Sequence, residues 1–166
     1  MTATHTVLDS PIGDLTVVAD DGVVIGLYFP QHWTRPDPGT FGERADEGFD
    51  TVATQLEEYF AGTRELFDLP TRADGNPFQL RVWEQIRQIP YGRTATYGAL
   101  ATALGDPSLA RTVGTAVGSN PLSILTACHR VVGKNGALTG YAGGLERKQH
   151  LLDLEQPPPQ ERGLLW

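Results

Sequence analysis

The sequence predicts an α+β fold, in which a small antiparallel sheet with one helix precedes a helical half that contains a helix-turn-helix. Three observations support this prediction. Short β-prone runs separated by turn signals fill the chain up to residue 30. Apolar residues at helical spacing dominate after a polar stretch at residues 71–76. The net charge also changes sign across this stretch, and 166 residues leave room for one large domain or two small ones that share an interface.

The first half begins with a predicted meander of three strands. Runs rich in Val, Leu and Thr are separated by turns that contain Gly and Asp. The runs span residues 6–8, 15–19 and 23–29. Residues 31–49 are polar and rich in Pro, Gly and Asp, and they predict a loop.

One helix is expected to cover this sheet. Apolar side chains recur at helical spacing between Phe49 and Gly62, where the glycine supplies a stop. Residues 66–70 then predict an edge strand, and the polar stretch that follows is the candidate domain boundary. The expected division is a supporting domain, a second domain and a tail, at residues 1–75, 76–155 and 156–166.

The second half is predicted to be helical. Asn76 directly before a proline is a typical N-cap, and it starts an amphipathic helix that ends at Pro90. Thr96 can cap a second helix, and Ser108 can cap a third that runs to about Gly118. A short glycine-containing turn between the second and third helices gives the outline of a helix-turn-helix.

Composition excludes several classes of protein. Hydrophobic residues make up 40% of the chain and charged residues 20%, which is typical of a globular protein with a core and not of a disordered chain or a coiled coil. No apolar run approaches the roughly 20 residues that span a bilayer, and the N-terminus lacks the pattern of a signal peptide, so we expect a cytoplasmic protein. The single cysteine, Cys128, argues against disulfides and multi-cysteine zinc sites, and we expect no metal or other cofactor.

The negative net charge of the whole chain is unevenly distributed between its two halves. A net charge of -7 argues at first sight against a nucleic-acid partner. Residues 1–75 carry four basic against fourteen acidic side chains, a net of -10, whereas residues 76–152 carry eight against three, a net of +5. A basic half is compatible with phosphate contacts, although a chance asymmetry of solvated surfaces would give the same numbers.

The third helix of the second half has an unusual composition. Most of its residues are small, among them Ala110 and Gly114, and Arg111 is its only charged residue. Small side chains let a backbone approach its partner closely, so this helix suits the minor groove of DNA, with Arg111 as a wedge in the base stack. Close packing between helices is the structural alternative.

Cys128 is the candidate nucleophile. His129 and Arg130 follow it, and they favour the thiolate if the fold brings the imidazole or a bridging water to the sulfur. Without such a base, a lone buried cysteine is usually an inert small hydrophobe. A third group should orient the histidine. The acidic candidates downstream are Glu146, Asp153 and Glu155.

Two loops flank the predicted strand that carries the cysteine. Asn120 before a proline marks a turn, and its side chain can tie two backbone segments together. Residues 141–144 form a glycine-containing loop that suits a pocket wall, and a last helix is expected over residues 145–154.

The run from Asn120 to Gly133, together with residues 138–145, carries a family resemblance. Shorter motifs support it at residues 78–83, 89–92, 96–98 and 110–114, and more loosely at 9–13 and 56–62. In these segments the chain closely resembles the O6-alkylguanine-DNA alkyltransferases, also called methylated-DNA–protein-cysteine methyltransferases. The resemblance implies a ribonuclease H-like first domain and a DNA-binding second domain.

The resemblance also implies direct reversal of DNA damage. A guanine alkylated at O6, or a thymine methylated at O4, is rotated out of double-stranded DNA, and the alkyl group moves irreversibly to the protein, once per molecule. The implied partner is the minor groove of the duplex, bound by a monomer, with cooperative binding along the DNA left open.

Catalytic roles carry over by motif. The resemblance makes Cys128 the acceptor and His129 a base that acts through a water, with Glu155 orienting the histidine. Asn120 holds the turn under the cysteine, and Tyr97 assists the departing guanine. These roles fit the chemistry, because transfer to sulfur needs a thiolate and the leaving base needs a donor.

Substrate contacts carry over in the same way. Backbone groups of Cys128 and Val131 would recognise the exocyclic amine of guanine, and the amide of Ala142 would contact O6. Tyr141 would line the pocket, and Lys148 occupies the position of a lysine near the active site.

The implied DNA contacts lie on the two helices of the helix-turn-helix. Arg111 would fill the vacated base stack, Ala110 and Gly114 would contact the DNA from the same helix, and Tyr97 would rotate the phosphate.

The chain departs from the family pattern at three positions. Ser123 and Ala127 replace prolines, which predicts looser placement of the nucleophile and either slower transfer or altered stability, without loss of the chemistry. His150 replaces a bulky aromatic, and the lack of a cysteine before Cys128 predicts no zinc ion in the first half.

Two other functions compete with alkyl transfer. One is a damage-recognition protein of the alkyltransferase-like kind, which lacks the acceptor cysteine. The other is a Cys-His hydrolase, which needs an oxyanion site.

Overall fold

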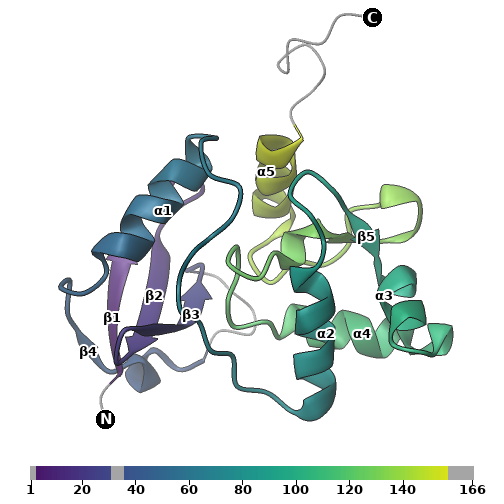
Figure 1. Cartoon of the computed structure of the whole chain (residues 1–166), viewed down its shortest axis with the longest axis horizontal. Coiled ribbons are helices and arrows are strands. Elements are labelled where there is room, and N and C mark those ends of the chain that lie inside the picture. Colours follow the sequence, from purple (N-terminus) through teal and green to yellow (C-terminus); the bar gives the residue numbers. More distant parts are fainter. Residues whose placement is uncertain (1–2, 31–35, 157–166) are drawn as a thin grey trace, which may run out of the picture.

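A computed structural model of the chain describes residues 3–30 and 36–156, and it has the expected α+β architecture. Figure 1 shows the sheet with helix α1 on one side, helices α2, α3 and α4 on the other, and α5 between the two groups. Most of the predicted tail and part of the predicted loop at 31–49 lie outside the described residues.

The three predicted strands form an antiparallel meander. They are β1 (Ala3–Leu8), β2 (Leu15–Asp20) and β3 (Val23–Tyr28). The sheet is nevertheless mixed, because a fourth strand, β4 (Glu43–Arg44), pairs parallel to β1 at the edge. A hydrogen bond of 2.7 Å from Thr6 Oγ1 to Asp46 holds the returning chain. A one-turn 3-10 helix, η1 (Pro38–Phe41), precedes it, so the predicted loop contains regular structure.

A glycine allows the returning chain to approach β1 closely. Gly42 follows η1 with φ of 79°, in the left-handed region, and a Cβ there would lie 1.8 Å from the carbonyl oxygen of Ala3. Any side chain at this position would push β4 away from β1.

The edge strand predicted at residues 66–70 is wrong. The backbone next to this segment pairs with the sheet through an isolated bridge between Thr71 and Val24, with the Val24 amide 3.0 Å from the carbonyl oxygen of Pro70. A proline has no amide hydrogen to extend a ladder, and Leu66 is 78% exposed.

The helices begin and end close to where the sequence predicts. Helix α1 (Asp50–Phe60) lies on the sheet, and α2 (Pro77–Arg87) starts with a capping box between Asn76 and Gln79. Thr96 caps α3 (Tyr97–Ala103) by accepting from the Ala99 amide at 3.0 Å. Helix α5 spans Leu145–Glu155, one residue longer than predicted.

The predicted cap on the third helix of the second half is wrong. Helix α4 (Ala110–Gly118) has no side-chain cap, and a 3-10 turn, η2 (Pro107–Leu109), precedes it. The hydroxyl of Ser108 donates to Asp106 at 2.7 Å, so Asp106 is the residue that caps the turn. The order of α3, a short turn and α4 still matches the predicted helix-turn-helix.

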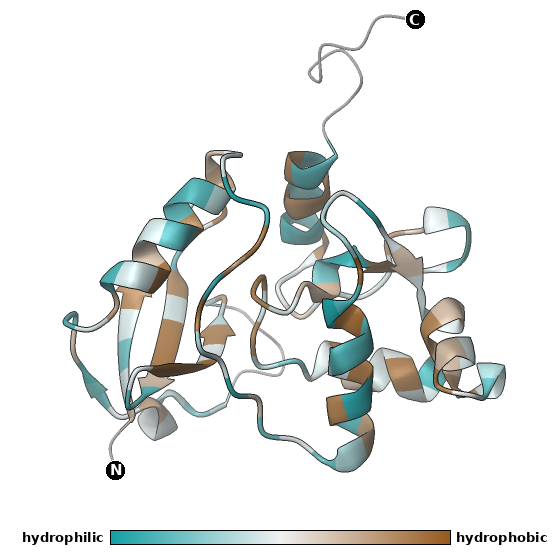
Figure 2. Ribbon diagram, viewed as in Figure 1, coloured by the Kyte–Doolittle hydropathy of each residue, from teal (hydrophilic) through white to brown (hydrophobic). Residues whose placement is uncertain are grey.

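One hydrophobic core extends through both halves. It combines residues of the sheet and α1 with residues of α2, α4 and α5, and Figure 2 shows hydrophobic stretches, in brown, on the strands and on α2 and α5. The amide of Leu27 in β3 donates to the carbonyl oxygen of Pro121 at 2.8 Å, next to the candidate nucleophile's loop. Because the core crosses it, the domain boundary at residue 75 stays a prediction. In the part of the chain that the structure describes, no helix combines the length and apolarity needed to cross a membrane.

Candidate active site and DNA-facing groove

Cys128 lies in a one-turn 3-10 helix, η3 (Cys128–Arg130), and not on the strand that the sequence suggested. Strand β6 (Val131–Val132) follows directly and pairs parallel to β5 (Ala95–Thr96). The cysteine is 3% exposed.

The loop before Cys128 is held by one buried amide. Asn120 donates from Nδ2 to the carbonyl oxygen of Thr126 at 2.9 Å and accepts from the Leu122 amide at 3.0 Å. Within this loop Ile124 has φ of 71°, an uncommon conformation for a β-branched residue. The predicted role of Asn120 as a tie between backbone segments agrees with these contacts.

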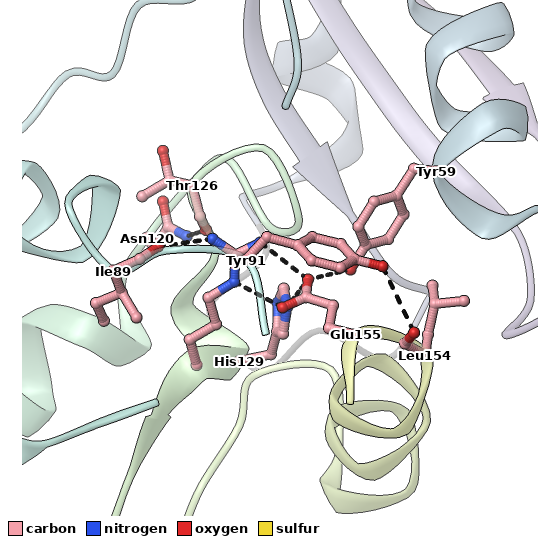
Figure 3. Close-up of polar contacts among 9 residues, drawn as sticks. Tyr59, Ile89, Tyr91, Asn120, Thr126, His129, Leu154 and Glu155 are labelled. Carbon is pink, nitrogen blue, oxygen red and sulfur yellow. Dashed lines mark hydrogen bonds and ion pairs between the residues drawn. The ribbon is translucent and has the colours of Figure 1, made fainter. Parts of the chain in front are cut away.

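His129 and Glu155 form the centre of a buried polar cluster (Figure 3). His129 Nε2 lies 2.7 Å from Glu155 Oε2, and neither side chain is more than 1% exposed. Arg130 donates to both carboxylate oxygens, at 2.7 Å from Nε and 3.0 Å from NH2. Tyr59 of α1 donates to Oε2 at 2.5 Å. Of the three acidic candidates, the fold therefore brings Glu155 to the histidine, whereas Glu146 and Asp153 are exposed.

This cluster determines the protonation state of His129. Burial alone would raise the pKa of Glu155, but hydrogen bonds from His129 and Arg130 lower it to about 2, so the carboxylate is ionised. Burial lowers the pKa of His129 more than Glu155 raises it, and the imidazole is neutral at pH 7. An ionised carboxylate only accepts hydrogen bonds, so Nε2 carries the hydrogen and Nδ1 carries a lone pair. Nδ1 is buried and has no hydrogen-bond partner among the described residues.

The Cys128 thiol is protonated in this environment. Burial raises its pKa, while a hydrogen bond from Asn120 and the charge of Lys148 oppose the rise. Arg130, which the sequence placed as a cation beside the sulfur, instead binds Glu155 and the carbonyl oxygen of Ile89, at 2.8 Å from NH1. Formation of the thiolate therefore requires a base, and Nδ1 of the neighbouring imidazole has the free lone pair for it.

The loop at 141–144 is packed from the first half of the chain. Tyr141 and Ala142 are buried, and the ring of Phe29 lies 6.0 Å from that of Tyr141. A Cβ at Gly143 would lie 2.3 Å from Phe29 Cδ2, so this glycine permits a close approach that no other residue would. Arg147 donates to the carbonyl oxygens of Ile12 and Gly143 at 2.7 and 3.0 Å.

Lys148 and Val131 are fully buried. The Lys148 ammonium donates to the carbonyl oxygen of Thr139 at 2.8 Å, and burial lowers its pKa to about 8 against the opposing effect of Cys128. Lys148 thus connects the surroundings of the thiol to the backbone at Thr139.

The four predicted DNA contacts line one open groove of about 630 Å³. They are Tyr97, Ala110, Arg111 and Gly114. Arg111 is exposed, and a Cβ at Gly114 would lie 3.6 Å from the Tyr97 ring. Thr139 and Gly140, which sequence reasoning missed, form the side of the groove that Lys148 supports.

Tyr59 is a further site residue that the sequence did not indicate. Its place on the apolar face of α1 indicated a core residue, and only its hydroxyl distinguishes it from the phenylalanine that would serve there.

Comparison with known proteins identifies the family. Residues 77–157 match a family model described as "6-O-methylguanine DNA methyltransferase, DNA binding domain", and residues 4–73 match one described as "6-O-methylguanine DNA methyltransferase, ribonuclease-like domain". The methylated-DNA–protein-cysteine methyltransferase of Mycobacterium tuberculosis is 45% identical over 157 residues, 90% of each chain. The chain belongs to the methylated-DNA–protein-cysteine methyltransferase family. Its function is accordingly direct-reversal DNA repair, with transfer of the alkyl group to a cysteine of the protein.

Other members of the methyltransferase family agree with this assignment. The Shigella flexneri relative is 54% identical over 153 residues, which are 86% of this chain and 90% of the relative. The crystal structure of the Mycobacterium tuberculosis protein in complex with DNA superposes with a TM-score of 0.87 at 42% identity, covering 92% of both chains. A second structure of that protein has a TM-score of 0.85 and covers 93% of both chains. The predicted fold class and family resemblance are therefore confirmed.

Proposed function

We propose that the protein moves the alkyl group of O6-alkylguanine in double-stranded DNA to Sγ of Cys128, once per molecule. The supporting observation is the state of His129, a neutral imidazole fixed by the ionised Glu155. The Nδ1 lone pair of His129 has no hydrogen-bond partner among the described residues, and the protonated thiol of Cys128 directly precedes this histidine in the sequence. Cys128 is also the only cysteine of the chain. O4-methylthymine is a second substrate of the same site.

The chemistry begins with removal of the thiol proton. A water passes the proton from Cys128 to Nδ1 of His129, and Glu155 stabilises the imidazolium. The sulfur lone pair attacks the alkyl carbon while the bond between that carbon and O6 breaks, and the guanine leaves with the bonding electrons. The hydroxyl of Tyr97 supplies a proton to the departing base and regains one from solvent. The same groups cannot remove the alkyl group from the thioether and regenerate the thiol, so each molecule acts once.

The substrate base reaches the thiol by rotation out of the duplex. Helix α4 approaches the minor groove through its small residues, and Arg111 occupies the gap in the base stack. The exposed position of Arg111 on the open groove, with Ala110 and Gly114 beside it, supports this docking. A monomer acting in the cytoplasm is sufficient for the reaction.

Recognition of the flipped base uses the backbone around the thiol. Carbonyl groups of Cys128 and Val131 accept from the exocyclic amine of guanine, and the Ala142 amide donates to O6. Tyr141 forms the wall of the pocket, and Lys148 holds the adjoining backbone through its bond to Thr139.

Intact-mass measurement after mixing with a duplex that contains O6-methylguanine tests the proposal. We expect one added methyl group on the protein, located at Cys128, and no addition in Cys128→Ala. Unchanged mass with retained binding would indicate a damage-recognition protein instead, and repeated turnover of an ester substrate would indicate a hydrolase. An undamaged duplex of the same sequence is the control.

A further inference from the structure

We propose that Tyr59, from the first half of the chain, is a positioning residue for the transfer reaction, acting through the carboxylate of Glu155. This inference rests on the proposed relay between Glu155 and His129. It assigns the first half a part in the chemistry, in addition to its structural role.

Tyr59 and His129 share one oxygen atom. The Tyr59 hydroxyl lies 2.5 Å from Glu155 Oε2, and His129 Nε2 lies 2.7 Å from the same atom (Figure 3). The Tyr59 residue is 1% exposed. Burial and the neighbouring charge of Glu155 raise the pKa of Tyr59 far above its usual value, so the hydroxyl is protonated and donates at neutral pH.

The tyrosine ring is itself fixed by packing. Ring centroids of Phe67 and Tyr91 lie 5.3 and 6.4 Å from that of Tyr59, the second in an edge-on arrangement. The hydroxyl therefore has a defined position before any substrate binds, as an orienting group requires.

The origin of the donors explains why this contact matters. His129 and Arg130 both belong to the turn that carries Cys128, so their bonds alone would let the carboxylate move together with that turn. Glu155 is the last residue of α5, and helices tend to fray at their ends. In the part of the chain that is described, Tyr59 is the donor to this carboxylate from outside that turn, and it fixes Oε2 relative to α1 and the sheet.

Tyr59 also adjusts the basicity of the imidazole. A donor on Oε2 withdraws negative charge from the oxygen that His129 faces, which weakens the attraction for a proton on the imidazole. Removal of the hydroxyl should therefore raise the pKa of His129 and move the acidic limb of the pH–rate profile to higher pH. The lost orientation should at the same time slow transfer by about tenfold, the effect expected for one hydrogen bond to a charged group.

Single-turnover transfer rates measured from about pH 4.5 to about pH 9 would test both effects, because this range brackets the ordinary pKa of histidine. The variants are Tyr59→Phe, which keeps the ring, and Leu56→Ala, which truncates another buried residue of α1 whose side chain has no group to hydrogen-bond Glu155. We expect Tyr59→Phe to be slower with an acidic limb at higher pH. Leu56→Ala should lower the melting temperature and leave the position of the limb unchanged.

A second substitution strengthens the donor and keeps the packing. Incorporation of 3-fluorotyrosine at position 59 makes the hydroxyl more acidic, so the acidic limb should shift to lower pH. Wild-type rate and profile in both Tyr59 variants would overturn the inference. Glu155→Gln and His129→Ala separate this outcome from failure of the relay: if both react at the wild-type rate, the proposed relay itself is wrong.

Discussion

Arg147 and Ile12, which are 135 positions apart in the sequence, are joined by a hydrogen bond of 2.7 Å from Nε to the carbonyl oxygen. The same guanidinium donates to Gly143 at 3.0 Å and lies 5.1 Å from the centre of the Phe29 ring. The turn between β1 and β2 is thereby connected to the loop that carries Tyr141. The first half thus contacts both ends of α5, through Ile12 at Arg147 and through Tyr59 at Glu155.

Replacement of Arg147 should loosen the loop at 141–144. In Arg147→Met the aliphatic stem remains and both hydrogen bonds are lost, which should cost about 1–2 kcal/mol of stability and slow alkyl transfer. Urea unfolding and amide hydrogen exchange of the loop measure the two effects. Arg64→Met, which removes an ion pair with Glu58 at a partly exposed site, is the control and should change neither the loop nor the rate. Unaltered exchange in Arg147→Met would contradict the prediction.

The position before the nucleophile should accept the proline that the family usually has there. Ala127 has φ of -78°, which lies within the range of proline. Ala127→Pro should raise the free energy of unfolding by about 0.4–1 kcal/mol through the unfolded chain, and transfer should be at least as fast as in the wild type. Ala127→Gly should change stability in the opposite direction. Chemical denaturation and single-turnover rates provide the readout, and a destabilised Ala127→Pro would show that the local backbone is incompatible with the ring.

The ionised state of Glu155 should make the fold sensitive to acid. Its pKa of about 2 lies below its usual 4.5, so its contribution to stability is complete above the value of the unfolded chain and is lost as the pH falls from about 4.5 to 2. That contribution should be about 3 kcal/mol. Urea unfolding at several pH values should show a steep loss in the wild type and a flatter one in Glu155→Gln. Asp153→Asn, an exposed carboxylate of the same helix, should keep the wild-type slope; equal slopes in all three proteins would refute the prediction.

Replacement of Arg111 should reduce DNA binding more than the intrinsic reactivity of the Cys128 thiol. Arg111 is exposed on the groove and donates no hydrogen bond to the buried Glu155 cluster. Arg111→Ala should therefore weaken duplex binding and slow base rotation, while the Cys128 thiol keeps its reactivity toward a small alkylating reagent. Arg87→Ala, another exposed arginine that hydrogen-bonds Thr71, is the control. Equal loss of DNA repair and of small-molecule reactivity in Arg111→Ala would count against a role as a wedge.

Local signals in the sequence predicted most elements of the fold. The N-cap at Asn76, the cap at Thr96 and the strand runs depend on residues within a few positions of each other. Both caps lie where predicted, and the strands lie within a few residues of the predicted runs. Two errors came from competing local partners. Ser108 donates to Asp106 instead of capping α4, and Pro70 prevents the segment before it from extending the sheet.

The sequence by itself determined the order of elements, the opposite charges of the two halves, and the succession of Cys128 and His129, because each depends on neighbouring residues. Spacing left three acidic candidates open and the family resemblance indicated Glu155, but only the tertiary structure brings Glu155 to His129 and Tyr59 to Glu155 across 96 positions. It also turned Arg130 toward that carboxylate and buried the thiol, which raises the pKa of Cys128. Burial and long-range hydrogen bonds set the protonation of each group, and they exist only after the two halves pack around one core.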